Sequence, residues 1–152
     1  PRHFAFRPDG KFAYVINEML SNVTAFSYDG KGGLTDIQTI STLPTGYKAY
    51  NSTAEIRVHP SGNFLYGSNR GHDSIVGYHV DADGSLSPFG HFPVPSSPRS
   101  FNAEPSGRFL YCAGESAGRM VTFSVDQKSG ELQRVGECEV GKSPFWVMAV
   151  TL

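Results

Sequence analysis

The amino-acid sequence predicts an all-β protein that is built from repeated units of four antiparallel strands, and three observations support this prediction. Segments of about six to nine residues, rich in Val, Ile, Phe, Tyr and Thr, alternate with turn residues along the chain. No segment sustains the apolar period of about 3.6 residues that marks a helix. Finally, the pattern of about the first fifty residues occurs again twice further along the chain.

The repeat is marked by three turns of the form Pro-Asp/Ser-Gly, which begin at Pro8, Pro60 and Pro105 and so lie 52 and 45 residues apart. A charged residue and then an aromatic residue follow each turn at fixed distances, and a Gly-x-Leu or similar turn opens the last strand of the unit. A period of this length with four strands is the sequence signature of a β-propeller blade. A β-sandwich with accidental similarity among its hairpins is the alternative.

Taken in order, the blade units cover approximately residues 1–50, 51–97 and 98–143, and residues 144–152 match the first strand of a further blade. A single four-stranded sheet cannot bury both of its faces, so blades stack around a channel. Closed propellers have about four to eight blades. Because the chain opens at Pro1, inside the strand-entry motif, we expect the missing blades to come from a longer parent chain or from another subunit.

Composition argues against several classes of partner. The chain has 13 Lys and Arg residues against 14 Asp and Glu residues, so it lacks the basic field that attracts nucleic acid or an anionic membrane. No apolar run approaches the roughly 18 residues of a spanning helix, and no signal-peptide pattern opens the chain. We therefore expect a soluble, cytoplasmic protein that binds neither nucleic acid nor membranes.

The two cysteines are predicted to be free thiols. Cys112 and Cys138 fall on the second and fourth strands of the third unit. Two strand spacings place them about 9.6 Å apart, beyond the roughly 7 Å limit for the Cα atoms of a disulfide. Free thiols fit a reducing compartment.

Strand direction gathers many polar residues at one rim of the predicted blades. Residues before the first strand and after the second strand of a blade share this rim, whereas the Pro-x-Gly turns lie at the opposite rim. Glu18 and Arg70 occupy equivalent positions on adjacent blades, so we expect them to face one another across a bound ligand. His59 lies beside a turn of the opposite rim, and a structural role is predicted for it. The residues of the polar rim are Arg2, His3, Asn17, Glu18, Asn51, Ser52, Arg70, His72, Asp73, Arg99, Glu115 and Ser116.

The connection between the first two units is longer than its later counterpart and also reaches the polar rim. It comprises residues 41–50, in which Tyr47, Lys48 and Tyr50 offer side chains that could wall a pocket. A solvated loop that merely tolerates insertion is an equally good interpretation.

Several motifs in this order resemble one known family. They are PRHFAFRPDGKFAYVINE, NSTAEIRVHPSGNFLYGSNR, SPRSFNAEPSGRFLYCAGE and the terminal GKSPFWVMAV. Together they resemble the C-terminal half of the seven-bladed propeller lactonases, a family that includes bacterial 6-phosphogluconolactonase and fungal 3-carboxy-cis,cis-muconate cycloisomerase. The resemblance implies hydrolysis of 6-phosphoglucono-δ-lactone to 6-phosphogluconate, a step of the pentose phosphate pathway, without metal or organic cofactor. An intramolecular lyase that acts on a muconolactone and a non-catalytic binding scaffold are the alternatives.

The resemblance also implies a set of site residues. Its catalytic positions correspond to Arg2, His3, Glu18 and Arg70, whereas a histidine from one blade earlier has no counterpart in this chain. We hypothesise that Glu18, with His3, orients or deprotonates the attacking water, while Arg2 and Arg70 bind phosphate or the charge on the lactone carbonyl oxygen. Side chains alternate along a strand, so Arg2 is favoured over His3 for the channel. The candidate substrate-binding residues are Asn17, Asn51, Asn69, His72 and Lys48. Arg99 and Glu115 are expected to form a structural ion pair.

Overall fold

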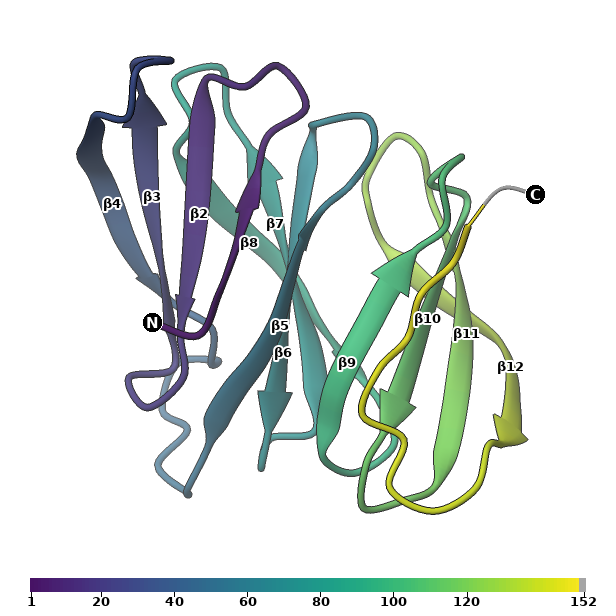
Figure 1. Ribbon diagram of the computed structural model, residues 1–152. Coiled ribbons are helices and arrows are strands. Elements are labelled where there is room, and N and C mark those ends of the chain that lie inside the picture. The colour runs from purple at the N-terminus through teal and green to yellow at the C-terminus, as the bar shows by residue number, and fades with distance from the viewer. Residues whose placement is uncertain (151–152) are drawn as a thin grey trace.

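The computed structural model describes residues 1–150, and over this range it contains twelve strands in three four-stranded antiparallel sheets (Figure 1). The first sheet has β1 (His3–Phe6), β2 (Phe12–Asn17), β3 (Asn22–Tyr28) and β4 (Leu34–Ser41). The second has β5 (Ser52–Val58), β6 (Phe64–Arg70), β7 (Ser74–Val80) and β8 (Leu86–Pro93). The third has β9 (Pro98–Ala103), β10 (Phe109–Gly114), β11 (Arg119–Val125) and β12 (Leu132–Glu139). In every sheet the strands are hydrogen-bonded in chain order, which confirms the all-β propeller-blade prediction.

The repeated Pro-x-Gly turns join the first two strands of each sheet in the same way. The backbone N–H of Gly10 donates to the carbonyl of Arg7 at 2.9 Å, and the equivalent bonds of Gly62 and Gly107 measure 2.8 Å. The φ angles of these three glycines are 70°, 76° and 75°, in the left-handed region that favours glycine. Their conformation therefore explains why glycine recurs at the end of each turn.

The core lies between the sheets, which stand side by side like blades (Figure 1). One cluster joins Tyr14 and Ile16 of the first sheet to residues such as Leu65 of the second. A second cluster joins the other face of the second sheet, through residues such as Tyr66, to Phe101 and its neighbours in the third. The middle sheet is consequently buried on both faces, as the stacking of blades requires.

The same hydrogen bond connects the first sheet to the second and the second sheet to the third. The hydroxyl of Tyr14 donates to the carbonyl of Gly84 at 3.2 Å, and the hydroxyl of Tyr66 donates to the carbonyl of Gly130 at 2.7 Å. Each tyrosine lies on the second strand of its sheet, and each glycine lies in the turn before the last strand of the next sheet. The repeat in the sequence is thus also a repeat of contacts between blades.

His59 makes a further contact between the second and third sheets. It is 1% exposed, and its Nε2 lies 2.8 Å from the carbonyl oxygen of Gly107 while its Nδ1 lies 2.8 Å from the hydroxyl of Ser61. Both ring nitrogens are therefore engaged within the protein, in agreement with the predicted structural role.

The segment that follows the third sheet covers most of the predicted first strand of a further blade. The structure assigns no strand to residues 144–150, and residues 151 and 152 lie outside the described range. A strand is defined by hydrogen bonds to a neighbouring strand, whereas the bond that ties this segment to the third sheet runs from the backbone N–H of Val147 to the hydroxyl of Ser100, at 3.0 Å. The first strand of a further blade over residues 144–152 stays a prediction, because its pairing needs the neighbouring strands of that blade.

Both cysteines are free, as predicted, with Cys112 buried on β10 and Cys138 exposed on β12. Burial raises the pKa of the Cys112 thiol, which favours the protonated form. Within residues 1–150 the structure contains no helix with the length and apolar character needed to cross a membrane.

Candidate active site

A bulge in β5 exposes backbone groups at the centre of the candidate site. The pairing of β5 with β6 shifts register between Thr53 and Ile56, which leaves Ala54 and Glu55 outside the ladder. The N–H of Glu55 instead donates to the hydroxyl of Ser68 at 2.9 Å. Because bulges re-aim side chains and free backbone groups, this irregularity lets neighbouring polar side chains bond to β5.

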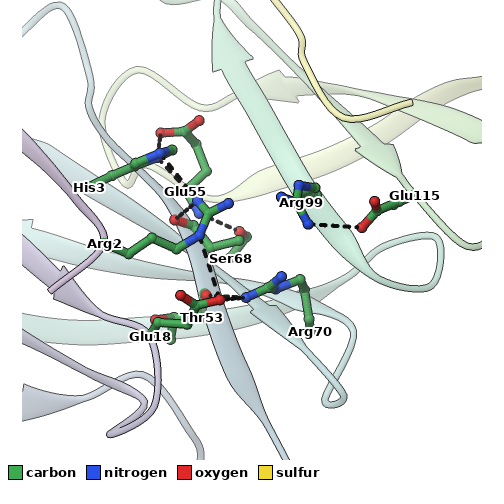
Figure 2. A network of polar contacts seen from close by, with 10 residues as sticks. Arg2, His3, Glu18, Thr53, Glu55, Ser68, Arg70, Arg99 and Glu115 are labelled. Atoms are coloured by element: carbon green, nitrogen blue, oxygen red, sulfur yellow. Dashed lines mark hydrogen bonds and ion pairs between the residues drawn. The ribbon is translucent and has the colours of Figure 1, made fainter. Parts of the chain in front are cut away.

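Arg70 and Glu18 bond directly to one another at the polar rim, where the sequence places them at equivalent positions on adjacent blades and predicts that a ligand lies between them. Arg70 ends β6, and Glu18 follows the end of β2. One terminal nitrogen of Arg70, Nη2, donates both to Oε1 of Glu18 and to the carbonyl of Thr53, the latter at 2.9 Å (Figure 2). The backbone carbonyl of Glu18 in turn accepts from the N–H of Thr53 at 3.0 Å. The two sheets therefore fix the positions of both side chains.

Arg2 completes a group that we call the rim cluster: Arg2, Glu18 and Arg70. The Nε of Arg2 lies 3.7 Å from Oε1 of Glu18, and its Nη1 donates to the carbonyl of Ala54 at 2.7 Å. The side chains of Arg2 and Arg70 are only 15% and 14% exposed, whereas that of Glu18 is 36% exposed. Two guanidinium groups thus share one carboxylate, which leaves an excess of positive charge.

The charges in the rim cluster shift the pKa values of its members. The hydrogen bond from Arg70 lowers the pKa of Glu18, and the positive charges of Arg70 and Arg2 lower it further. Burial lowers the pKa of Arg2, and the neighbouring charge of Arg70 adds to this effect. Glu18 is therefore ionised at neutral pH and is a weak proton acceptor.

His3 bonds to a different carboxylate from its neighbour Arg2, but the two side chains contact one another, so strand alternation does not separate them. Its Nδ1 lies 2.9 Å from Oε1 of Glu55, a carboxylate of the second sheet (Figure 2). The Nη1 of Arg2 lies 3.3 Å from both ring nitrogens of His3. His3 is thus adjacent to the rim cluster and contacts it through Arg2.

Arg99 and Glu115 form the expected ion pair on the third sheet, with 3.5 Å between Nη1 and Oε2. Figure 2 shows this pair beside the rim cluster. The charge of Arg99 contributes to the lowered pKa values of both Arg2 and Glu18. It therefore adds to the positive potential at this rim.

Asn51 and Asn69, two of the candidate substrate-binding residues, make their hydrogen bonds within the protein. Asn69 is fully buried, and its side-chain oxygen accepts from Thr42 at 2.7 Å and from Asn51 at 3.1 Å. Its amide nitrogen donates to the carbonyl of Thr42 at 2.8 Å. Asn51 is 8% exposed and also bonds to Ser21 at 2.9 Å and to the N–H of His72 at 3.1 Å. These amides anchor the connection between the first two sheets, so their polar atoms are not available to a substrate.

The other proposed binding residues lie outside the rim cluster. Asn17 donates to Asn22 at 2.8 Å across the turn between β2 and β3. His72 packs edge-on against Tyr47, with 4.9 Å between ring centroids, and Lys48 is exposed in the same connection. The structure therefore does not bring Asn17, His72 and Lys48 together with Arg2, Glu18 and Arg70.

Sequence reasoning missed a row of polar side chains on β5. Among the described residues, the buried side-chain nitrogen and oxygen atoms that lack a hydrogen-bond partner all belong to β5 or β6. They are Thr53 Oγ1, Glu55 Oε2, Arg57 Nε and Arg70 Nε. The signal that could have revealed this row is its period of two, since Thr53, Glu55 and Arg57 alternate with the apolar residues Ala54, Ile56 and Val58.

Stacked sheets of four antiparallel strands in chain order, with charged residues gathered at one rim, define a β-propeller with a polar candidate site. The chain belongs to a family within this class, the seven-bladed β-propeller lactonases. The model of that family, described as "Lactonase, 7-bladed beta-propeller", matches residues 1–149.

Individual proteins agree with this assignment. The chain is 36% identical to a 6-phosphogluconolactonase of Pectobacterium atrosepticum, over 100% of this chain and 46% of that protein. A solved structure from Lactobacillus plantarum has a TM-score of 0.93 and 30% identity over 96% of this chain and 43% of that one. The periplasmic gluconolactonase of Pseudomonas aeruginosa has a TM-score of 0.88 and 33% identity, over 93% and 40% respectively. The chain thus spans about half the length of the curated relatives it matches.

Proposed function

We propose that the protein hydrolyses the ring ester of a phosphorylated sugar lactone, 6-phosphoglucono-δ-lactone, to 6-phosphogluconate. The observation that carries this proposal is the rim cluster, in which Arg2 and Arg70 share the single carboxylate of Glu18. Guanidinium groups bind phosphate and carboxylate through charge-assisted hydrogen bonds, and they stabilise an oxyanion in the same way. Membership of the lactonase family and the relatives named 6-phosphogluconolactonase support the same reaction.

The reaction needs a water molecule, a proton acceptor and a site for negative charge. Water adds to the lactone carbonyl carbon, the carbonyl oxygen becomes an oxyanion, and the ring C–O bond then breaks to give a carboxylic acid and a hydroxyl. Arg2 and Arg70 provide positive charge for the substrate phosphate or for the oxyanion. Glu18 keeps the two guanidinium groups in place and can orient the water as a hydrogen-bond acceptor.

The proposal concerns the closed ring and not these three sheets alone. Phe4, Phe6 and Leu34 on the outer face of the first sheet are 66%, 45% and 50% exposed. We propose that further blades, from the same polypeptide or from another subunit, cover this face and contribute the remaining part of the site. We also propose a cytoplasmic location, which the free thiols support and cell fractionation can test.

The test is an initial-rate assay on the intact protein with 6-phosphogluconolactone and with unphosphorylated gluconolactone. We expect kcat/KM to be at least about a hundredfold higher for the phosphorylated substrate, because the other lacks the charge-assisted bonds to arginine. Equal values would remove phosphate recognition from the proposal. Conversion of a carboxymuconolactone in the absence of lactone hydrolysis would favour the lyase alternative.

A further inference from the structure

Glu55 is a buried carboxylate in the middle of β5, the first strand of the second sheet, and the packing of the sheets does not account for it. Its side chain is 2% exposed. Its Oε1 accepts from the N–H of Ile56 at 3.2 Å and lies 2.9 Å from Nδ1 of His3. Its Oε2 accepts no hydrogen bond, although Nη2 of Arg57 lies 3.5 Å away. A carboxylate in such surroundings costs several kcal/mol unless charged partners compensate.

The contact with Glu55 selects one tautomer of His3. An ionised carboxylate can only accept a hydrogen bond, so the proton of a neutral His3 ring resides on Nδ1. The other nitrogen, Nε2, then carries the lone pair of the ring, and Nη1 of Arg2 lies 3.3 Å from it, so a water molecule that reaches Nε2 must take the place of this contact. The ring is 35% exposed, so a ligand or a water molecule can reach it.

His3 and Glu55 line a pocket that adjoins the rim cluster. The pocket has a volume of about 210 Å³. The side chain of Trp146 closes part of it and lies over the guanidinium of Arg57, with 6.0 Å between the guanidinium carbon and the ring centroid. The residues that line the pocket are Arg2, His3, Phe4, Glu55, Arg57 and Trp146. Arg2 belongs both to this pocket and to the rim cluster, so one substrate can contact both.

Glu18 is the less suitable proton acceptor of the two candidates. Its carboxylate is held by Arg70 and lies close to Arg2, and the hydrogen bond from Arg70 lowers its pKa. A base that is stabilised in its ionised form by two cations takes up a proton poorly. Glu18 has two guanidinium groups as neighbours, whereas His3 has one guanidinium, that of Arg2, and the carboxylate of Glu55.

We propose that Glu55 is a positioning residue that holds His3 in the tautomer with an unprotonated Nε2, so that His3 serves as the general base for the lactone hydrolysis proposed above. Nε2 removes a proton from water as the water oxygen bonds to the carbonyl carbon. When the ring C–O bond breaks, the same Nε2–H returns a proton to the departing ring oxygen, which becomes a hydroxyl. His3 ends as it began, and one water molecule is consumed for each lactone. This inference rests on the proposed function.

The test compares Glu55→Gln with the wild type in the intact protein. The amide can donate to Nδ1 and so stabilise the opposite tautomer, which places the proton on Nε2. We expect kcat to fall by at least about thirtyfold, because a positioned general base contributes roughly a hundredfold or more. KM is expected to change by less than about threefold, because the rim cluster that binds the anion is intact. The matched control is Glu137→Gln, which removes a carboxylate that is paired with Arg119 on the outer strands of the third sheet.

Nitrogen-15 NMR of the imidazole rings gives a readout that does not depend on activity. In the wild type, His3 is expected to show a protonated Nδ1 and an unprotonated Nε2, with the resonances of the chain's five histidines assigned through His3→Gln. In Glu55→Gln the fraction of this tautomer should fall. Urea unfolding curves of both proteins check that the variant is folded.

The outcomes distinguish this inference from the proposed function. Unchanged kcat in Glu55→Gln, or a wild-type His3 with its proton on Nε2, would overturn the role of Glu55 while wild-type hydrolysis continued to support the lactonase. Failure of the wild type to hydrolyse the lactone would refute the proposed function, and this inference with it. If Glu55→Gln does not fold, two other measurements test the proposal. It is contradicted if His3 of the wild type carries its proton on Nε2, or if His3→Gln has the same kcat as the wild type.

Discussion

Replacing Arg70 with alanine is expected to lower kcat/KM for 6-phosphogluconolactone by at least about a hundredfold, as the loss of a preorganised oxyanion or phosphate donor typically does. Arg70 is only 14% exposed and bonds to both Glu18 and the backbone of Thr53, so its position is fixed before a ligand arrives. Without Arg70, the remaining partner of Glu18 is Arg2, whose Nε lies 3.7 Å from Oε1 of Glu18. Initial rates measured over a range of substrate concentrations give kcat/KM for the wild type and the variant.

A suitable control for Arg70→Ala is Arg119→Ala. Arg119 also pairs with a carboxylate, that of Glu137, but it is 44% exposed and lies on the outer strands of the third sheet. We expect this control to retain kcat/KM within about threefold of the wild type, because exposed ion pairs contribute little. Equal losses in the two variants would mean that the effect comes from general destabilisation, and the assignment of Arg70 would be wrong.

Replacing Glu18 with glutamine is expected to lower kcat by about a hundredfold, because a neutral amide cannot hold two guanidinium groups in place. The hydrogen bond and charge of Arg70 lower the pKa of Glu18 below its ordinary value of 4.5. The carboxylate of the wild type therefore stays ionised at all pH values above 4.5. The ratio of wild-type to variant kcat should be constant from neutral pH down to that value.

The same lowered pKa determines the sign of the effect on stability. A carboxylate whose pKa is lower in the folded than in the unfolded protein contributes to stability at pH values above its unfolded-state pKa. This contribution is lost as the pH falls through the pKa of the folded state. The difference in unfolding free energy between the wild type and Glu18→Gln should therefore shrink below about pH 4.5. Urea unfolding at several pH values measures it. A difference that grows on acidification would show that Glu18 is not paired as described.

The fold and the proximity of Glu18 to Arg70 could be predicted because both follow from the repeat, whereas their direct contact, with no ligand between them, was not predicted. Equivalent positions on stacked blades lie at the same height, so two residues 52 positions apart come together without any long-range information. The Pro-x-Gly turns were equally predictable, since proline and glycine fix backbone conformation locally. The strand predicted for residues 144–152 stays a prediction, because a strand also requires a neighbour to pair with.

The parts of the site that were missed depend on burial and on backbone irregularity. Asn51 and Asn69 looked like ligand-binding amides, but they bond to one another and to Thr42 inside the connection between two sheets. A polar residue type does not reveal whether its hydrogen bonds are satisfied within the protein. Glu55 was overlooked because its orientation depends on the bulge in β5, which no turn residue in the sequence announces.

A crystal structure of the intact protein with 6-phosphogluconate bound tests the central claim most directly. The claim is that the rim cluster of Arg2, Glu18 and Arg70 holds the anionic groups of the substrate. We expect a phosphate or carboxylate oxygen of the product within hydrogen-bond distance of the guanidinium groups of Arg2 and Arg70. A product molecule bound elsewhere on the protein, with Arg70 still directed only to Glu18 and Thr53, would contradict it.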